Sequence, residues 1–126
     1  MAENKKAKAY TEEEENIGNV QISEQVVAVI AGIAATEVEG VASLVGNITT
    51  ELVSKIGLGS LSKGVKIKMI DNSVYVNVTI DIYYGCVVPK VCRNVQEKVT
   101  SAVENMTGLS VGEVNVFVAD VTLDKN

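Results

Sequence analysis

The chain has 126 residues, a hydrophobic content of 47%, a single proline and a formal net charge of −5. A chain of this length can bury one hydrophobic core, so we expect one globular domain. The acidic balance excludes nucleic acid and anionic lipid as expected partners of the body, because both are negatively charged. The sequence contains no histidine, which removes the commonest general base and the commonest metal ligand.

The two ends of the chain differ from its body. Residues 1–16 carry lysines and then four consecutive glutamates, a composition typical of a disordered tail. Residues 17–123 carry the apolar patterns of a single folded domain, and residues 124–126 form a short polar end. No apolar run approaches the roughly 20 residues that cross a bilayer, and no hydrophobic signal core is present. We therefore expect a cytoplasmic protein with no direct membrane span.

The first half of the domain predicts a helix between two short strands. Ser23 suits an N-cap, and the apolar stripe that follows predicts a helix to about Val38. The short strands are expected over residues 18–22 and 41–45. Gly40 is expected to end the helix in the left-handed conformation that glycine adopts without steric cost.

The second half contains the clearest patterns. Apolar residues at every even position of the run 74–84 predict a long central strand with one face on the core. Residues 65–70 are predicted to pair with it as a hairpin, through a turn at residues 71–73. Apolar residues at spacings of three and four over 88–106 predict an amphipathic helix that ends at Gly108.

These elements define the expected fold. Several glycines interrupt residues 46–64, which we predict to be a flexible insertion with a turn or two of helix. A last strand is centred on residues 114–118. The order is β-α-β, insertion, β-β-α-β, with two helices on one face of a mixed sheet. This order predicts a two-layer α+β sandwich.

The sequence gives no support for catalysis, a metal or a cofactor. Cys86 and Cys92 are six residues apart, unlike the two to four of a zinc knuckle, and packing is their expected role. In residues 57–64 the lysine precedes the last glycine and a strand follows, which is not the order of a phosphate loop. The carboxylates are scattered, and no local spacing forces two of them together. We therefore assign no catalytic, cofactor-binding or metal-binding residue.

The sheet face away from the helices is the one surface that we single out. Its candidate members are aromatic, charged or polar residues of three strands, and we expect the aromatic ones to be neighbours: Tyr75, Thr79, Asp81, Tyr83, Phe117, Lys66 and Lys68. Exposed aromatics on a sheet occur in RNA-binding folds, but the RNP signature is absent and the chain is acidic. Three interpretations remain open: a protein-contact face, a face that is simply semi-polar, and a face covered by the insertion.

Several segments resemble the alkaline shock protein family of Gram-positive bacteria. They are residues 18–23, 29–35 and 37–41 in the first half, and 63–65, 84–85, 89–91, 94–96 and 114–116 in the second. The resemblance covers about residues 17–122. It implies a small cytoplasmic protein linked to alkaline and cell-envelope stress, without a catalytic motif. Some members are held at the membrane by a membrane-anchored partner, and this chain looks closest to a branch associated with control of fatty-acid synthesis.

Together, these observations favour a non-enzymatic protein of the envelope stress response. We expect it to act through a protein partner, which the resemblance suggests is membrane-anchored, or through self-association as a homo-oligomer. Its expected location is the cytoplasm, or the membrane periphery when that partner recruits it. The alternative is a small regulatory module that binds a metabolite or an enzyme of fatty-acid synthesis, with a pocket between the insertion and the sheet.

Overall fold

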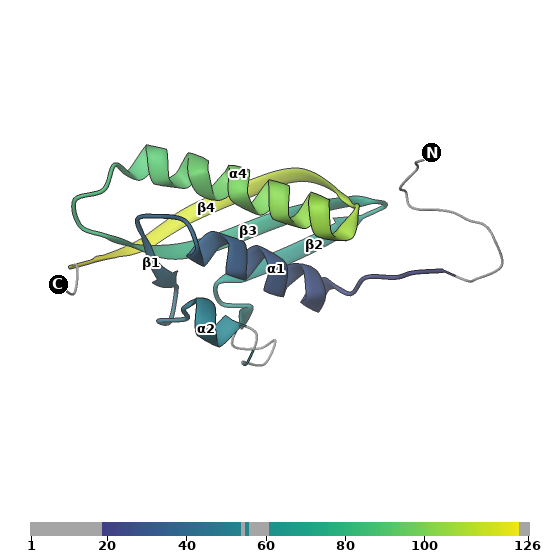
Figure 1. Ribbon diagram of the computed structural model, residues 1–126, viewed down its shortest axis with the longest axis horizontal. Coiled ribbons are helices and arrows are strands. Elements are labelled where there is room, and N and C mark those ends of the chain that lie inside the picture. The colour runs from purple at the N-terminus through teal and green to yellow at the C-terminus, as the bar shows by residue number, and fades with distance from the viewer. Residues whose placement is uncertain (1–18, 54, 56–60, 124–126) are drawn as a thin grey trace.

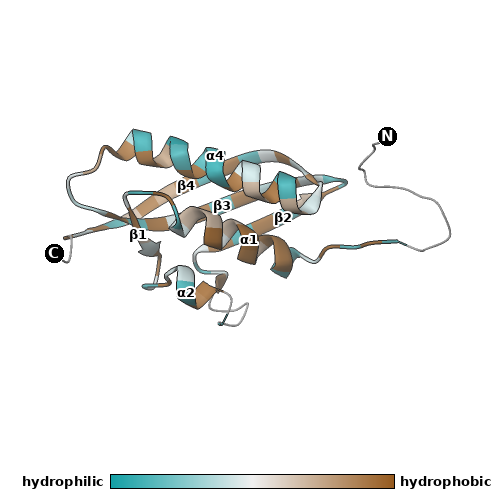
Figure 2. Cartoon of the chain, viewed as in Figure 1, coloured by the Kyte–Doolittle hydropathy of each residue, from teal (hydrophilic) through white to brown (hydrophobic). Residues whose placement is uncertain are grey.

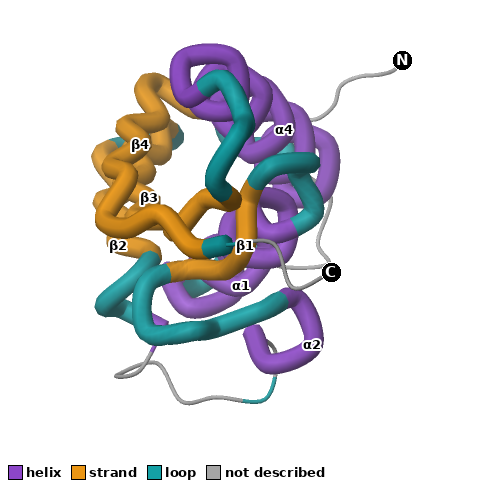
Figure 3. Tube along the Cα trace, turned by 90° about the vertical axis from the view of Figure 1, so that its left-hand side faces the viewer, coloured by secondary structure: helices purple, strands orange, loops and turns teal. Residues whose placement is uncertain are grey.

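The computed structural model describes residues 19–53, 55 and 61–123 (Figure 1). The predicted tail at 1–16, the polar end at 124–126 and part of the predicted insertion lie outside the described residues. The helices are α1 (Glu24–Thr36), α2 (Thr50–Val53) and α4 (Val88–Thr107), and the strands are β1 (Val41–Leu44), β2 (Val65–Ile70), β3 (Ser73–Tyr83) and β4 (Ser110–Thr122). Figure 3 shows α1 and α4 together on one face of the sheet, so the predicted α+β sandwich is confirmed.

The sheet is organised around β3, the strand whose alternation is the clearest in the sequence. β4 pairs with it in parallel over its whole length, from Ser73 to Tyr83. β1 and β2 pair with it antiparallel and must therefore share its other edge. β2 lies beside residues 73–78 of β3, and β1 lies beside residues 80–82. The sheet is mixed, as predicted.

The core lies between β3 and the two long helices. The even-numbered side chains of β3 are at most 1% exposed, and they are Val74, Val76, Val78, Ile80 and Ile82. One stripe of α4 covers them with four valines, Val91, Val95, Val99 and Val103, of which the first is 5% exposed and the others are fully buried. Figure 2 shows that the outer side of α4 is hydrophilic. Burying each such side chain contributes roughly 1.5–3 kcal/mol. The packing of the apolar face of β3 against the apolar stripe of α4 is therefore a main source of the stability of this fold.

α1 begins where the sequence predicts and ends earlier. The Ser23 side chain accepts a hydrogen bond from the backbone N–H of Val26 at 3.2 Å, as expected of an N-cap. The helix ends at Thr36 instead of Val38, and its C-cap is Glu37, whose N–H bonds to carbonyls of the last turn. Gly40 has a φ of +101°, but it lies three residues beyond the cap, in the turn into β1. The prediction that Gly40 ends the helix is therefore wrong.

The predicted strand at 18–22 is absent from its described part. Residues 19–22 belong to no strand, and residue 18 lies outside the described residues. Val20 is 89% exposed. Figure 1 shows this segment leading away from the body at the start of α1. The alternating pattern is present, but no strand of the described chain lies where the segment could pair with it.

The predicted insertion is anchored to the core on both sides of its undescribed part. α2 provides the expected turn of helix. Ile48, Val53 and Leu61 are 7%, 0% and 1% exposed, so these three residues belong to the hydrophobic core. A Cβ added at Gly32 of α1 would lie 3.2 Å from Cγ1 of Val53, so α1 and α2 pack closely at this glycine.

The remaining turns follow the sequence. β2 and β3 form the predicted hairpin, with Asp71 in the left-handed region at a φ of 56°. Pro89 lies in the first turn of α4. Backbone N–H groups of the first turn make no hydrogen bond within the helix, so the N–H that proline lacks is not needed there. Gly108 caps α4 at a φ of 78° and donates its N–H to the Glu104 carbonyl at 2.9 Å. β4 is longer than predicted, because it begins at Ser110 and continues to Thr122.

Candidate functional site: the open face of the sheet

The sheet face opposite α1 and α4 is formed by the odd-numbered residues of β3 and their cross-strand neighbours, and we call it the open face. Residues that pair across strands share a face, so the register assigns its members. All seven candidate residues lie on it, together with neighbours from β1, β2 and β4: Lys66, Lys68, Tyr75, Asn77, Thr79, Asp81, Tyr83, Ser43, Glu113, Asn115, Phe117, Asp120 and Thr122. No helix of the described chain covers this face (Figure 3).

The end of the open face near the start of β3 combines an aromatic ring with charges of both signs. Tyr75 pairs with Lys68 on one side and with Glu113 on the other. Its ring lies against the backbone of Gly112, where an added Cβ would be only 2.6 Å from Cε1. Gly112 is the extra residue of a β-bulge in β4, and its missing side chain leaves room for the ring.

A shallow depression of about 320 Å³ lies at this end. It is open to solvent and is lined by Lys66, Ile67, Lys68, Ile70, Tyr75, Asn77, Glu113 and Asn115. A pocket for a small molecule usually encloses most of the ligand. This open surface suits contact with a protein side chain better than capture of a small ligand.

The middle of the open face is ordered by one side-chain hydrogen bond and carries one exposed aromatic residue. The Asn115 side chain donates from Nδ2 to Oδ1 of Asn77 at 2.9 Å, across β4 and β3. Phe117 pairs with Thr79 and is 57% exposed. Large aromatic side chains on a surface are enriched at protein interfaces, so Phe117 is the strongest single candidate for a contact residue.

The end of the open face near the end of β3 is acidic. Asp81 and Asp120 are direct cross-strand partners, and Ser43 of β1 lies on the other side of Asp81. Oδ1 of Asp81 is buried and has no hydrogen-bond partner among the described residues. Burial raises the pKa of Asp81 above its ordinary range, the charge of Asp120 raises it further, and a hydrogen bond with Ser43 opposes both.

A second shallow depression, of about 230 Å³, lies beside this carboxylate pair. It is lined by Ala42, Ser43, Asn47, Thr49, Asp81, Tyr83, Asp120, Thr122 and Leu123. It lies between the sheet and the first residues of the predicted insertion. Two carboxylates in one open depression repel anionic ligands.

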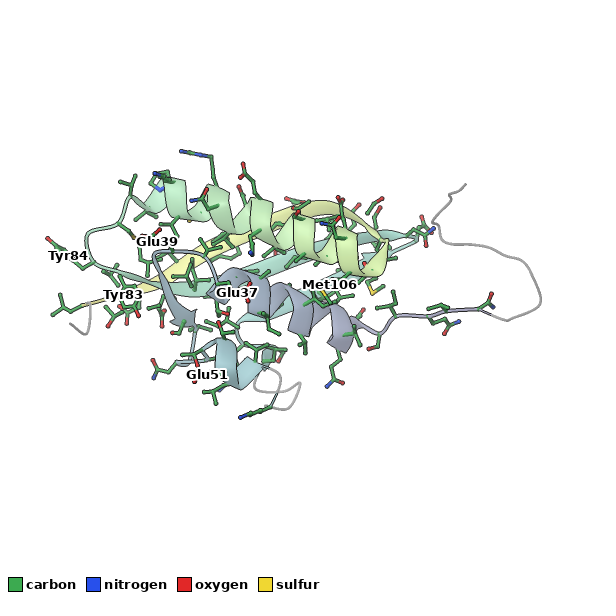
Figure 4. The ribbon with its side chains drawn as sticks, in the orientation of Figure 1. Glu37, Glu39, Glu51, Tyr83, Tyr84 and Met106 are labelled. Atoms are coloured by element: carbon green, nitrogen blue, oxygen red, sulfur yellow. The ribbon has the colours of Figure 1, made fainter. Side chains whose placement is uncertain are left out.

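The structure spreads the predicted aromatic residues along the face. Tyr75 and Tyr83 are eight residues apart on β3, which is about 26 Å along an extended strand. Phe117 pairs with Thr79, halfway between them. Figure 4 shows Tyr83 and Tyr84 together at one end of the molecule. The expectation that the three aromatic residues are neighbours is therefore wrong, although they share one face.

Two features of the face were missed by the reasoning from sequence. Asp81 and Asp120 form a pair, although no local spacing brought them together, because they meet only through the parallel pairing of β3 with β4. Gly112 was not singled out, because its role depends on the Tyr75 ring beside it. A glycine inside an alternating strand is a recognised signal of a bulge and could have indicated this position.

The two thiols are free and half-buried. The Cys86 thiol donates to the backbone carbonyl of Tyr83 at 3.1 Å, in the turn between β3 and α4. Burial raises the pKa of the Cys92 thiol, and the nearby Cys86 raises it further. A raised pKa lowers the thiolate fraction, so Cys92 is poorly suited to act as a nucleophile.

Two further findings concern the described residues only. They contain no group of three or more cysteine and acidic side chains that could hold a metal ion. None of the helices formed by these residues is both long enough and apolar enough to cross a membrane.

The fold and the open face define the class of protein: a two-layer α+β sandwich with one sheet face that no described helix covers. Comparison with protein families gives the particular family. The alkaline shock protein 23 family, described by its cell envelope-related function, matches residues 12–123. The chain therefore belongs to this family, which confirms the resemblance to the alkaline shock proteins.

Similar proteins occur in Gram-positive bacteria. YqhY of Bacillus subtilis is 38% identical over 112 residues, which cover 89% of this chain and 83% of that protein. Spy1535 of Streptococcus pyogenes is also 38% identical over 112 residues, covering 88% of this chain and 84% of that protein. A stress response regulator gls24 homolog of the same species is 30% identical over 105 residues, covering 82% of this chain and 59% of that longer protein.

Solved structures support the fold alone. Variants of MamM-CTD superpose with a TM-score of 0.50 at 13% sequence identity, covering 78% of this chain and 98% of theirs. At this identity the likeness concerns the arrangement of helices and strands and carries no statement about ligands.

Proposed function

We propose that this protein is a non-enzymatic component of the cell-envelope stress response that acts in the cytoplasm by binding another protein through the open face. The partner we expect is anchored in the membrane and holds this protein at the membrane periphery. The family's cell envelope-related function supports the envelope role, and the name of the gls24 homolog supports the link to stress.

One observation carries the proposal: the open face offers an exposed aromatic side chain on a rigid strand scaffold. Phe117 is 57% exposed, and it is held on β4 in register with Thr79 of β3. Tyr75 is held against Gly112 on the same face. Aromatic side chains with little conformational freedom lose little entropy on binding and are typical anchors of protein interfaces.

The test is affinity isolation of the full chain from native cells, with and without detergent, using wild type, Phe117→Ser and Tyr75→Ser. We expect a partner that is recovered with detergent by the wild type and lost by both variants, with melting temperatures nearly unchanged. Met106→Ser is the matched control, because Met106 is an apolar side chain that is 70% exposed on α4, away from the open face. Recovery of the same partner by both open-face variants would refute the proposal.

A second candidate function is the binding of a metabolite of fatty-acid synthesis. It is favoured by the depression between Ser43, Asn47 and Asp120, which lies where such a pocket is expected from the sequence. Its two carboxylates oppose the phosphates of an acyl-thioester of coenzyme A. Thermal-shift measurements with acyl-thioesters separate the two functions, because a ligand that binds the folded state must raise the midpoint of unfolding. We expect no shift.

A further inference from the structure

The segment before α1 has the sequence of a strand and no partner in the described chain. Residues 19–22 read Asn-Val-Gln-Ile, so apolar and polar side chains alternate. Val20 is 89% exposed, whereas Ile22 packs against the core. An exposed valine in an extended, alternating segment is suited to pairing with the edge of a sheet.

The outer edge of β2 is available for such pairing. The Thr79 N–H bonds to the Gly64 carbonyl at 2.8 Å, so the odd residues of β3 direct their backbone groups toward β2. Lys66 and Lys68 face odd residues of β3 and complete that ladder. The residues between them, including Ile67, therefore turn their N–H and C=O groups outward. No described strand pairs with this outer edge.

The other free edge of the sheet, on β4, is protected by side chains. Glu104 accepts a hydrogen bond from the Val111 N–H at 2.9 Å. Gln96 donates to the Val114 carbonyl at 3.1 Å, and Asp120 accepts from the Val121 N–H at 2.8 Å. Side chains that occupy backbone groups in this way block edge-to-edge pairing. Between the edges of β2 and β4, β2 is therefore the better acceptor.

Residues 19–22 match β2 in the alternation of their side chains, and the acidic run before them is opposite in charge to the lysines of β2. When residues 19–22 lie beside β2, Val20 joins the half-buried Ile67 and Met69 on the apolar face, and Gln21 joins Lys66 and Lys68 on the polar face. The sequence just before the segment carries the acidic run 12–15. Opposite charges therefore favour the association at low ionic strength.

The geometry at Ser23 directs the segment away from the body of its own chain. Ser23 is the only residue between the segment and α1, and its side chain and carbonyl accept hydrogen bonds from Val26 and Val27. These bonds fix the direction in which the chain leaves the helix, and Figure 1 shows that it leads away from the body.

We propose that residues 19–22 add as a strand to the β2 edge of a second copy of this chain. The interaction is strand addition, in which backbone hydrogen bonds supply affinity and alternate side chains supply specificity. It uses the β2 edge and leaves the open face uncovered, so its failure would not affect the proposed function.

The experiment measures the association of the full chain by analytical ultracentrifugation. Val20→Asp removes the apolar contact of the donor and should raise the dissociation constant by roughly tenfold or more. Ile67→Pro removes an outward N–H of the acceptor without breaking the ladder to β3, with Met69→Pro as the substitute if that variant fails to fold. Met106→Asp, at an apolar side chain that is 70% exposed on α4, should associate as the wild type does.

Mixing the variants provides the decisive measurement. Val20→Asp retains an intact acceptor edge and Ile67→Pro retains an intact donor segment, so the mixture should form a heterodimer although neither variant self-associates. A wild type that stays monomeric at every concentration would overturn the proposal. So would a Val20→Asp variant that associates as the wild type does, or a mixture that forms no heterodimer.

Discussion

The ring of Tyr75 lies so close to Gly112 that a Cβ atom at position 112 would be 2.6 Å from Cε1 and 3.0 Å from Cζ of that ring. Contacts this short are not tolerated, so any side chain at position 112 must displace the ring. Gly112 therefore determines where Tyr75 lies on the open face, although the two residues are on different strands and far apart in sequence.

Gly112→Ala is expected to move the Tyr75 ring with little loss of stability. The ring is half-buried and can turn toward solvent, so the free energy of unfolding should fall by less than about 1.5 kcal/mol. The ring proton resonances of Tyr75 in an NMR spectrum should shift, and binding of the partner should weaken. In a Tyr75→Ser background the same substitution should have no further effect on partner binding. An unchanged Tyr75 spectrum in Gly112→Ala would contradict the contact.

Asp81→Asn is expected to stabilise the protein at neutral pH. The substitution removes a half-buried charge that faces Asp120, and like charges directly opposite in a sheet cost up to about 1 kcal/mol. Because the pKa of Asp81 is raised above its ordinary value of 3.8, the folded state holds this proton more tightly than the unfolded chain does. Wild-type stability should therefore fall as the pH rises from about that value through the raised pKa.

The gain from Asp81→Asn should accordingly vanish in acid, below the ordinary pKa of an aspartate, and be complete above the raised pKa. Chemical denaturation at a series of pH values measures this profile. Asp71→Asn is the control, because it makes the same substitution at an exposed residue of the β2–β3 turn that has no carboxylate as cross-strand partner. A gain that persists unchanged in acid would show that charge is not its cause.

Local sequence patterns predicted most helices and strands of this fold. The contacts that they did not predict depend on pairing between segments that are distant in the sequence. The alternation of β3 and the apolar stripe of α4 are properties of single segments, so the sequence alone indicates both. The pairing of Asp81 with Asp120 depends on the parallel register of β3 and β4, which no local spacing encodes. Residues 19–22 show that a local pattern alone is not sufficient. Their side chains alternate as in a strand, but they form none, because no sheet edge of the described chain lies beside them.

Leu61→Ala should lower the free energy of unfolding by about 2–5 kcal/mol, although Leu61 lies in residues 46–64, which the sequence predicts to be a flexible insertion. Its side chain is 1% exposed and belongs to the core cluster. Leu52→Ala is a control of the same residue type, because Leu52 is 42% exposed on α2, and its loss should be below about 1 kcal/mol. Urea denaturation of both variants measures the difference, and equal losses would mean that the segment does not pack as described.

Comparing the stability of Gly40→Ala with that of Gly85→Ala separates two costs of an added Cβ, which are backbone strain and steric contact with neighbouring side chains. Both glycines have a φ of +101°, which costs an alanine roughly 1–2 kcal/mol. A Cβ at Gly85 would meet nothing within 4 Å, whereas one at Gly40 would lie 2.7 Å from Cγ2 of Val91, which is 5% exposed on α4.

Because Val91 is packed in the core and cannot move aside freely, Gly40→Ala should lose about 1–3 kcal/mol more than Gly85→Ala. Urea denaturation with matched slopes measures both losses. A Gly40→Ala loss that is no larger than the Gly85→Ala loss would show that α4 can shift away from the turn into β1.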